Sequence, residues 1–186
     1  MTSGASGVRI IGGTLRGRRI PLQAHAALRP TPDRVRETLF NWLAPVVRES
    51  RCLDLFAGSG ALGLEAWSRG AAAVTFVERN QENAAALTAL LARLDVKAPV
   101  YAMDALAFLE NQPACGFDIA FLDPPFDAGL LAPALKRLRE REIVRRGGFL
   151  YIETRRDHPC VLPKGLRWHR QGRAGQVAFG LAVDEE

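Results

Sequence analysis

Hydrophobic positions along the chain alternate between short apolar runs and longer stretches with helical spacing. Runs of strand length cover residues 51–57, 73–78, 117–122 and 149–153, with a further run near Val100. Between them, apolar residues fall on one face of a helix in residues 61–69, 80–94, 105–110 and 130–141. Strands and helices that alternate in this way are typical of a parallel sheet covered by helices on both sides.

Both ends of the chain depart from this alternation. Residues 166–170 and 176–183 are separated by the turn-rich residues 171–175 rather than by a helix, which predicts an antiparallel hairpin at one sheet edge. Residues 8–11 and 19–22 predict a small N-terminal β-hairpin, and the pattern turns helical from Thr31. We therefore expect a Rossmann-like, doubly wound α/β fold with a mostly parallel seven-stranded sheet. Residues 1–30 would form a basic hairpin or arm, and residues 31–186 the main domain.

Positive charge is concentrated at the start of the chain. The formal net charge is +5, but residues 1–36 hold seven arginines against Asp33 alone, which gives this segment +6 and leaves −1 for the other 150 residues. A cationic arm on a near-neutral body favours a polyanionic partner, because each bound phosphate releases counterions. A solvated, solubilising tail is the alternative interpretation.

Length and composition limit the class of protein. With 186 residues, 48% of them hydrophobic, the chain suits one domain with a small appendage. No apolar run approaches the roughly 20 residues that cross a bilayer, and the first residues lack a signal-type apolar stretch, so we expect a soluble, cytoplasmic protein. Cys52, Cys115 and Cys160 are far apart, and the three histidines show no ligand spacing beside them. We expect neither a metal site nor a disulfide framework.

A glycine-rich loop follows the first strand of the main sheet. The sequence LDLFAGSGALG at residues 53–63 places Gly58, Ser59 and Gly60 between a strand and a helix, where glycine lets a ligand approach the backbone closely. Glu78, 20 residues beyond Gly58, ends the next strand and could accept from ribose hydroxyls. The spacing also fits a dinucleotide site or a structural turn. Asp54 favours S-adenosylmethionine, because a carboxylate there could meet its cationic amino acid portion but would repel a pyrophosphate.

The second motif, Asp123-Pro124-Pro125-Phe126, comes directly after the apolar strand 117–122. Ligands of open α/β sheets bind at this carboxyl end. The two prolines restrict the backbone, so the Asp123 carboxylate and nearby carbonyls become rigid acceptors for the two N–H groups of an exocyclic amine. Phe126 offers a flat face on which a base can stack. Transfer from a sulfonium needs such orientation more than a strong base, although a rigid surface turn would have the same sequence.

Together the two motifs resemble the class I adenosylmethionine-dependent methyltransferases that act on amino groups, whose signature is [D/N]PP[F/Y/W]. That group methylates adenine N6, cytosine N4 or guanine N2, and the short motif does not choose among them. A longer pattern resembles the bacterial 16S rRNA guanine-N2 methyltransferases of the RsmD type over nearly the whole chain. It comprises RIIGG at 9–13, RGR at 16–18, RPTPDRVRETLFNWL at 29–43, residues 52–65, DPPF at 123–126 and GQV at 175–177.

The resemblance implies methyl transfer from S-adenosylmethionine to N2 of a specific guanine in 16S rRNA. It implies that Asp123, Pro124, Pro125 and Phe126 are catalytic residues that hold the target base. The implied RNA contacts are Arg9, Arg16, Arg18 and Arg19. The implied cofactor contacts are Thr31, Arg34, Asp54, Phe56, Gly58, Ser59, Gly60, Glu78, Asp104 and Ala105. Pro32 stands where the family often has a second threonine, which argues against a hydroxyl role at that position.

The expected partner is 16S rRNA within a 30S subunit or an assembly intermediate, because an arm of about +6 alone binds weakly at physiological salt. We expect the enzyme to act as a monomer. An adenine-N6 methyltransferase of DNA or RNA remains the alternative function. An NAD-dependent oxidoreductase would leave the DPPF motif unexplained, and a noncatalytic RNA-binding module would leave the glycine loop unexplained. The roles of Cys52 and of Trp168, which suits either edge packing or an RNA contact, are left open.

Overall fold

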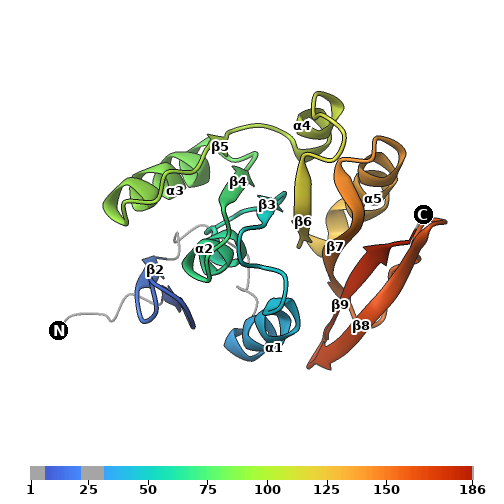
Figure 1. The fold of residues 1–186 in the computed structure, drawn as a ribbon, viewed down its shortest axis with the longest axis horizontal. Coiled ribbons are helices and arrows are strands. Elements are labelled where there is room, and N and C mark those ends of the chain that lie inside the picture. The colour runs from blue at the N-terminus through green and yellow to red at the C-terminus, as the bar shows by residue number, and fades with distance from the viewer. Residues whose placement is uncertain (1–6, 22–31, 186) are drawn as a thin grey trace.

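The computed structural model describes residues 7–21 and 32–185, and a seven-stranded sheet forms its centre (Figure 1). The first five strands in spatial order run parallel, and the last two pair antiparallel at one edge. This confirms the predicted mostly parallel sheet with an antiparallel edge hairpin. The spatial order is β5 (Val100–Tyr101), β4 (Ala73–Val77), β3 (Arg51–Asp54), β6 (Phe117–Leu122), β7 (Val144–Arg155), β9 (Val177–Asp184) and β8 (Leu166–Ala174).

Helices cover both faces of the sheet, as a doubly wound fold requires. Apolar side chains of α1, α2 and α3 pack in one core cluster, and those of α4 and α5 pack in a second cluster. Asn80 caps α3 through a bond from the Asn83 amide (2.9 Å), which explains where that helix begins. The helices are α1 (Asp33–Leu43), α2 (Ala61–Ser68), α3 (Gln81–Arg93), α4 (Ala105–Glu110) and α5 (Leu131–Glu140), with a 3₁₀ turn, η1 (Phe126–Ala128). No helix in these described ranges is long and apolar enough to cross a membrane.

The C-terminal hairpin differs from the prediction in where it turns. Residues 171–175 were expected to form the turn, but β8 continues to Ala174 and the turn is the two residues Gly175 and Gln176. Gly175 has φ +58°, which favours glycine. Gly172 does not turn the chain. A Cβ there would lie 2.6 Å from the Phe179 ring, so this glycine permits close packing between the strands.

The N-terminal hairpin consists of β1 (Gly7–Arg9) and β2 (Arg19–Pro21), paired antiparallel. Three of its apolar side chains, Val8, Ile10 and Ile20, are buried in the same core cluster as α1 and α2. The hairpin therefore packs directly on the main body of the protein. The division of the chain at residue 30 stays a prediction.

Glu65 of α2 holds the hairpin through a buried polar network. Its carboxylate accepts hydrogen bonds from the backbone amides of Ile11 (2.8 Å) and Gly12 (2.9 Å) and from Nε of Arg69 (2.8 Å). Arg36, fully buried like Glu65, lies with Nη1 3.6 Å from that carboxylate and donates from Nη2 to the Arg9 carbonyl (2.7 Å). These contacts fix the hairpin against two helices.

Gly13 allows the hairpin loop to approach α2 closely. It has φ +76°, and a Cβ built on it would lie 1.7 Å from the Ser68 carbonyl oxygen. The next residues bond to the same point of the helix, since the Thr14 amide donates to the Ser68 carbonyl (2.8 Å) and the Leu15 amide to its hydroxyl (2.8 Å). Only glycine suits this contact between loop and helix.

Candidate active site

Acidic side chains end four neighbouring strands at the carboxyl edge of the sheet. Glu78 follows β4, Asp54 ends β3, Asp123 follows β6 and Glu153 lies near the end of β7. Along each of the last three strands, side chains alternate between the two core clusters, so these three carboxylates point to the side of the sheet covered by α1 and α2. The two motifs predicted from the sequence thus meet on one face of one edge.

Asp54 is a buried carboxyl, 3% exposed, whose Oδ2 accepts a hydrogen bond from the Gly63 amide of α2 (2.9 Å). The pKa of Asp54 is raised to about 7, chiefly by burial; the hydrogen bond from the Gly63 amide lowers it, and the nearby Asp123 and Glu78 raise it. Within the described part of the chain, no ion pair involves Asp54. A cationic ligand at this edge could therefore provide the positively charged partner that Asp54 lacks among the described residues.

We expect the free energy of unfolding of Asp54→Asn to exceed that of the parent protein at pH 8 by roughly 4 kcal/mol. The amide oxygen can still accept from Gly63, but no buried charge remains. Between pH 4 and pH 7 the unfolded chain loses the Asp54 proton while the folded protein keeps it, because the pKa is raised to about 7 on folding. Stability of the parent should therefore fall as the pH rises through this window, whereas the variant lacks this dependence.

Urea unfolding of both proteins, without cofactor, at pH 5, 6, 7 and 8 measures the difference. The gap in unfolding free energy should widen from pH 5 to pH 7 and then level off. A gap that stays constant with pH would show that Asp54 ionises as readily in the folded protein as in the unfolded chain.

The glycine loop between β3 and α2 is tied to Glu78. The Gly58 amide donates to Oε2 of Glu78 (2.8 Å), and the Asn80 amide donates to Oε1 (2.8 Å). Gly58 and Gly60 have φ +51° and +77°, and a Cβ on Gly60 would lie 2.5 Å from Leu87 of α3. The loop therefore needs glycine both for its conformation and for its packing. Each oxygen of Glu78 retains capacity for a further donor such as a ribose hydroxyl.

The remaining predicted cofactor residues lie around the same edge, with two exceptions. Phe56 and Ser59 are half-buried in the loop. Asp104 follows β5 and caps α4, accepting from the Leu106 (2.9 Å) and Ala107 (3.0 Å) amides, and Ala105 is buried behind it. Arg34 is exposed on the first turn of α1, and Thr31 lies outside the described residues.

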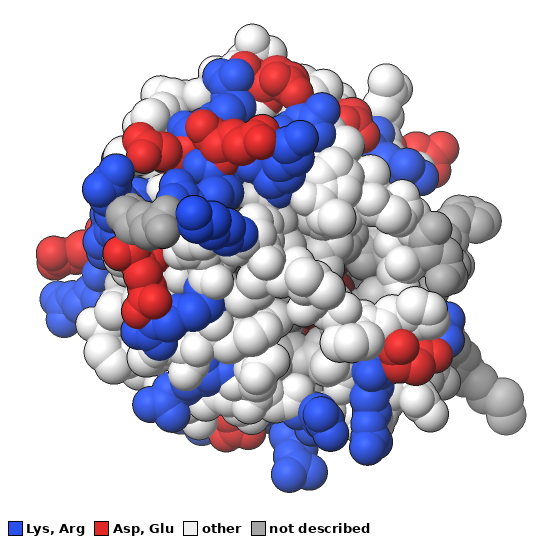
Figure 2. Space-filling view, turned by 90° about the vertical axis from the view of Figure 1, so that its right-hand side faces the viewer, with Lys and Arg blue, Asp and Glu red and all other residues white. Residues whose placement is uncertain are grey.

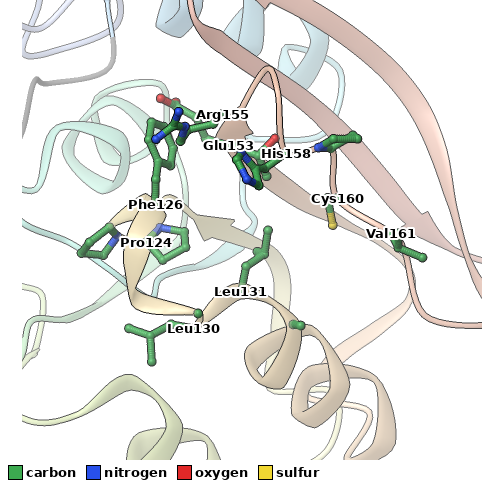
Figure 3. A pocket seen from close by; sticks show the side chains of 14 residues that line it. Pro124, Phe126, Leu130, Leu131, Glu153, Arg155, His158, Cys160 and Val161 are labelled. Atoms are coloured by element: carbon green, nitrogen blue, oxygen red, sulfur yellow. The ribbon is translucent and has the colours of Figure 1, made fainter.

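Pro124, Pro125 and Phe126 of the DPPF motif form one wall of a pocket of about 400 Å³, and Asp123 directly precedes them. Pro124 is buried, while Phe126 is 43% exposed and begins η1. Figure 3 shows Leu130 and Leu131, which follow this turn, approaching the pocket from the side opposite Phe126. A flat aromatic face, a rigid diproline and apolar walls make a site suited to a planar base.

Three polar residues of the pocket were not predicted from the sequence. Glu153, Arg155 and His158 come from the end of β7 and the loop after it, and they gather at one end of the pocket near Phe126 (Figure 3). They form no recognisable short motif. The signal that could have found them is their position, because β7 was predicted to end at residue 153 on the same edge as the two motifs. In the described ranges, no group of His, Cys, Asp or Glu is arranged to hold a metal ion.

The four arm arginines, Arg9, Arg16, Arg18 and Arg19, are all exposed on the N-terminal hairpin. Further exposed arginines, Arg156, Arg170 and Arg173, lie on or beside the strands of the C-terminal hairpin. Figure 2 faces this edge of the sheet, and Lys and Arg side chains gather along its lower margin with few acidic ones. The charge count along the sequence did not reveal this second basic region, because acidic residues elsewhere in residues 37–186 cancel its positive charge in the sum.

Comparisons with known proteins identify the family of this chain. The family model described as Conserved hypothetical protein 95 matches residues 8–182. Ribosomal RNA small subunit methyltransferase D from Escherichia coli (strain K12) is 44% identical over 181 residues, or 96% of this chain and 91% of that protein. The protein of the same name from Haemophilus influenzae is 43% identical over 180 residues, or 94% of this chain and 92% of that protein. The solved structure of yhhF from Escherichia coli has a TM-score of 0.87 at 42% identity and covers 97% of this chain and 99% of that one. These matches confirm the resemblance inferred from the motifs, and the chain belongs to the RsmD-type methyltransferase family, whose model is described as Conserved hypothetical protein 95.

Proposed function

We propose that this chain transfers a methyl group from S-adenosylmethionine to the exocyclic N2 of a specific guanine in 16S rRNA. The observation that carries the proposal is the adjacency of the two motifs. Asp54 ends β3 and Asp123 follows β6, and these strands are direct neighbours in the sheet. Neighbouring strands lie about 4.8 Å apart, so a donor held at Asp54 and an amine held at Asp123 would lie within reach of each other.

The described residues fit the cofactor. Asp54, a buried carboxyl without an ion pair among them, would meet the cationic methionine end, and the Phe56 to Gly60 loop would pass beneath it. Glu78 would accept from the ribose hydroxyls, and Asp104 with Ala105 would flank the adenine. Thr31 and Arg34 would border the same site. When bound, S-adenosylmethionine supplies an electrophilic methyl group on a sulfonium sulfur.

The DPPF motif would present the nucleophile. The Asp123 carboxylate and a neighbouring backbone carbonyl would accept the two N–H groups of guanine N2, while the base stacks on Phe126. This orients the nitrogen lone pair toward the methyl group. As the new C–N bond forms and the C–S bond breaks, N2 becomes cationic, and Asp123 stabilises that charge before one proton leaves. The products are N2-methylguanine and S-adenosylhomocysteine.

The RNA must offer an unpaired or flipped guanine, because pairing and stacking block N2 in a helix. We propose that the substrate is 16S rRNA within a 30S subunit or an assembly intermediate, that the protein acts as a monomer in the cytoplasm, and that the arm binds phosphates. The exposed arginines of the arm and of the C-terminal hairpin support contact with a polyanion on more than one side of the site.

We expect the combined change of Arg16, Arg18 and Arg19 to alanine to weaken RNA binding about tenfold to a hundredfold at 0.1 M salt. The logarithm of affinity should also fall less steeply with the logarithm of salt concentration, because fewer counterions are released. Filter binding to 16S rRNA at several salt concentrations measures both effects. The matched control replaces Arg48, Arg93 and Lys97, which are exposed outside both hairpins. An unchanged slope in the arm variant would leave the hairpin a purely structural feature.

A methyl-transfer assay tests the proposed function. The protein is incubated with tritiated S-adenosylmethionine and either 30S subunits, free 16S rRNA or duplex DNA, and the labelled nucleosides are then identified. Label in N2-methylguanosine from rRNA or 30S subunits is the expected result. Label in N6-methyladenine would preserve the chemistry but overturn the base assignment. Absence of both transfer and S-adenosylmethionine binding would overturn the enzymatic function.

A further inference from the structure

Glu153 lies beside Asp123 in the sheet. The strands β6 and β7 are paired in parallel up to Leu122 and Ile152, and Asp123 and Glu153 are the next residues of each strand. Because side chains alternate along strands, both carboxylates point to the same face, separated by about the 4.8 Å strand spacing. Glu153 also lines the pocket formed by Pro124 and Phe126. If Asp123 holds the exocyclic amine of a base, the ring nitrogen next to that amine would therefore lie close to Glu153.

A buried tyrosine holds the Glu153 carboxylate in place. The Tyr151 hydroxyl donates to Oε2 of Glu153 (2.8 Å), and Glu153 itself is 4% exposed. Burial, together with the charges of Glu153 and Asp123, raises the pKa of Tyr151 well above its ordinary value, so the phenol keeps its proton and remains a donor. The hydrogen bond therefore keeps Glu153 in the role of an acceptor at the pocket wall.

The atoms next to the reacting nitrogen differ among the bases that carry an exocyclic amine. In guanine, N2 is flanked by N1–H, a donor, and O6 follows as an acceptor. In adenine the amine N6 is flanked by N1, and in cytosine N4 is flanked by N3, and both of these ring nitrogens are acceptors. A carboxylate beside the held amine can accept a hydrogen bond from guanine N1–H. It would repel the lone pair on N1 of adenine or on N3 of cytosine. Arg155 lines the same pocket, and its Nε (3.0 Å) and Nη2 (2.8 Å) donate to Asp157, which holds the guanidinium in place there.

We propose that Glu153 selects guanine by accepting its N1–H while Asp123 holds N2, with Tyr151 as the residue that positions Glu153. This inference rests on the proposed function and deepens it, because it assigns the choice of base to a residue outside the DPPF motif. A site built to bond a polar edge rejects an analogue that lacks the donor far more strongly than a purely apolar pocket would.

Substrates that differ at N1 test the proposal. The modified guanine is first located by the methyl-transfer assay, and 30S subunits are then reconstituted with 16S rRNA carrying guanine, 2-aminopurine or hypoxanthine at that position. 2-Aminopurine keeps the amine but has an acceptor at N1 and lacks O6, so only the part of the preference for guanine that Glu153→Gln removes is assigned to N1. Hypoxanthine lacks the amine and reports methylation elsewhere. For the parent protein we expect kcat/KM with guanine to exceed that with 2-aminopurine by at least about 100-fold.

Glu153→Gln should reduce this preference. Its amide can donate to N1 of 2-aminopurine, so the ratio between the two substrates should fall below about tenfold, with activity on guanine reduced and affinity for S-adenosylmethionine unchanged within about threefold. Tyr151→Phe should lower the ratio in the same direction by a smaller factor. Glu140→Gln, on the exposed face of α5, is the matched control and should leave the ratio unchanged.

Each outcome separates this proposal from the proposed function. An unchanged ratio in a folded Glu153→Gln variant overturns the role of Glu153 while leaving guanine methylation intact. If that variant fails to fold, the activity ratio of the parent protein provides the test. Equal activity on guanine and 2-aminopurine would also overturn the role of Glu153. Failure of the parent protein to methylate guanine in any 16S rRNA substrate would instead overturn the proposed function.

Discussion

Asp123→Ala is expected to lower the rate of methyl transfer by about 1,000-fold or more. The substitution removes the acceptor that orients the N2 amine and stabilises its developing positive charge. Asp123 is half-buried directly after β6 and next to the pocket residue Pro124, whereas Asp54 and Glu78 lie at the ends of the strands that would bind the cofactor. Affinity for S-adenosylmethionine should therefore stay within about tenfold, or 1.4 kcal/mol.

Single-turnover rates with 30S subunits, alongside calorimetric binding of S-adenosylhomocysteine, measure these two effects separately. Asp123→Asn is the matched control. Its amide oxygen still accepts a hydrogen bond, and asparagine occurs in the general signature of this class, so it should retain more activity than the alanine variant. Equal losses of cofactor affinity and rate in Asp123→Ala would place Asp123 in the cofactor site instead.

Glu65→Ala is expected to lower the free energy of unfolding by about 3 to 5 kcal/mol, because it removes the buried carboxylate beside Arg36, whose other carboxylate partner, Asp33, is exposed. The amides of Ile11 and Gly12 lose their acceptor at the same time. Removal of one member of a buried ion pair costs far more than a surface ion pair contributes. Such a loss is a large fraction of the stability of a typical domain.

Urea unfolding measures the total effect, and hydrogen exchange at Ile11 and Gly12 reports the hairpin directly. Both amides should exchange much faster in the variant if the hairpin detaches before the core opens. Glu140→Ala, which breaks only the exposed pair with Lys136, should change stability by less than about 0.5 kcal/mol. A similarly small effect for Glu65→Ala would mean that the apolar packing of Ile10 and Ile20 and the hydrogen bonds to Ser68 hold the hairpin without Glu65.

Periodicity along the chain predicted most of the fold, because the central parallel strands are largely buried on both sides and the helices each have an apolar face. The helix at residues 105–110 and the strand at 117–122 were predicted with the bounds observed. The C-terminal hairpin was placed correctly, but its turn was not. Gly172 and Gly175 look alike in sequence, and only the contact between Gly172 and Phe179 distinguishes a packing glycine from a turn glycine.

The candidate site could be predicted only where residues form a local motif. Asp54 was found because it precedes the glycine loop, and Asp123 because it is the first residue of the DPPF motif. Glu153 was not, because its place beside Asp123 depends on the register between β6 and β7, which no local pattern encodes. The network around Glu65 is similar, since it joins residues more than 50 positions apart.

Helix α2 connects the glycine loop of the proposed cofactor site to the N-terminal hairpin that is proposed to bind RNA. The glycine loop enters its first turn, and Glu65 and Ser68 near its last turn hold the N-terminal hairpin. Its eight residues span about 12 Å. If the arm binds phosphates as proposed, its attachment to so short and rigid an element would fix the distance between the bound RNA backbone and the methylated base. A flexible tether would tolerate changes in that distance, whereas this arrangement would discriminate against an rRNA in which it has changed.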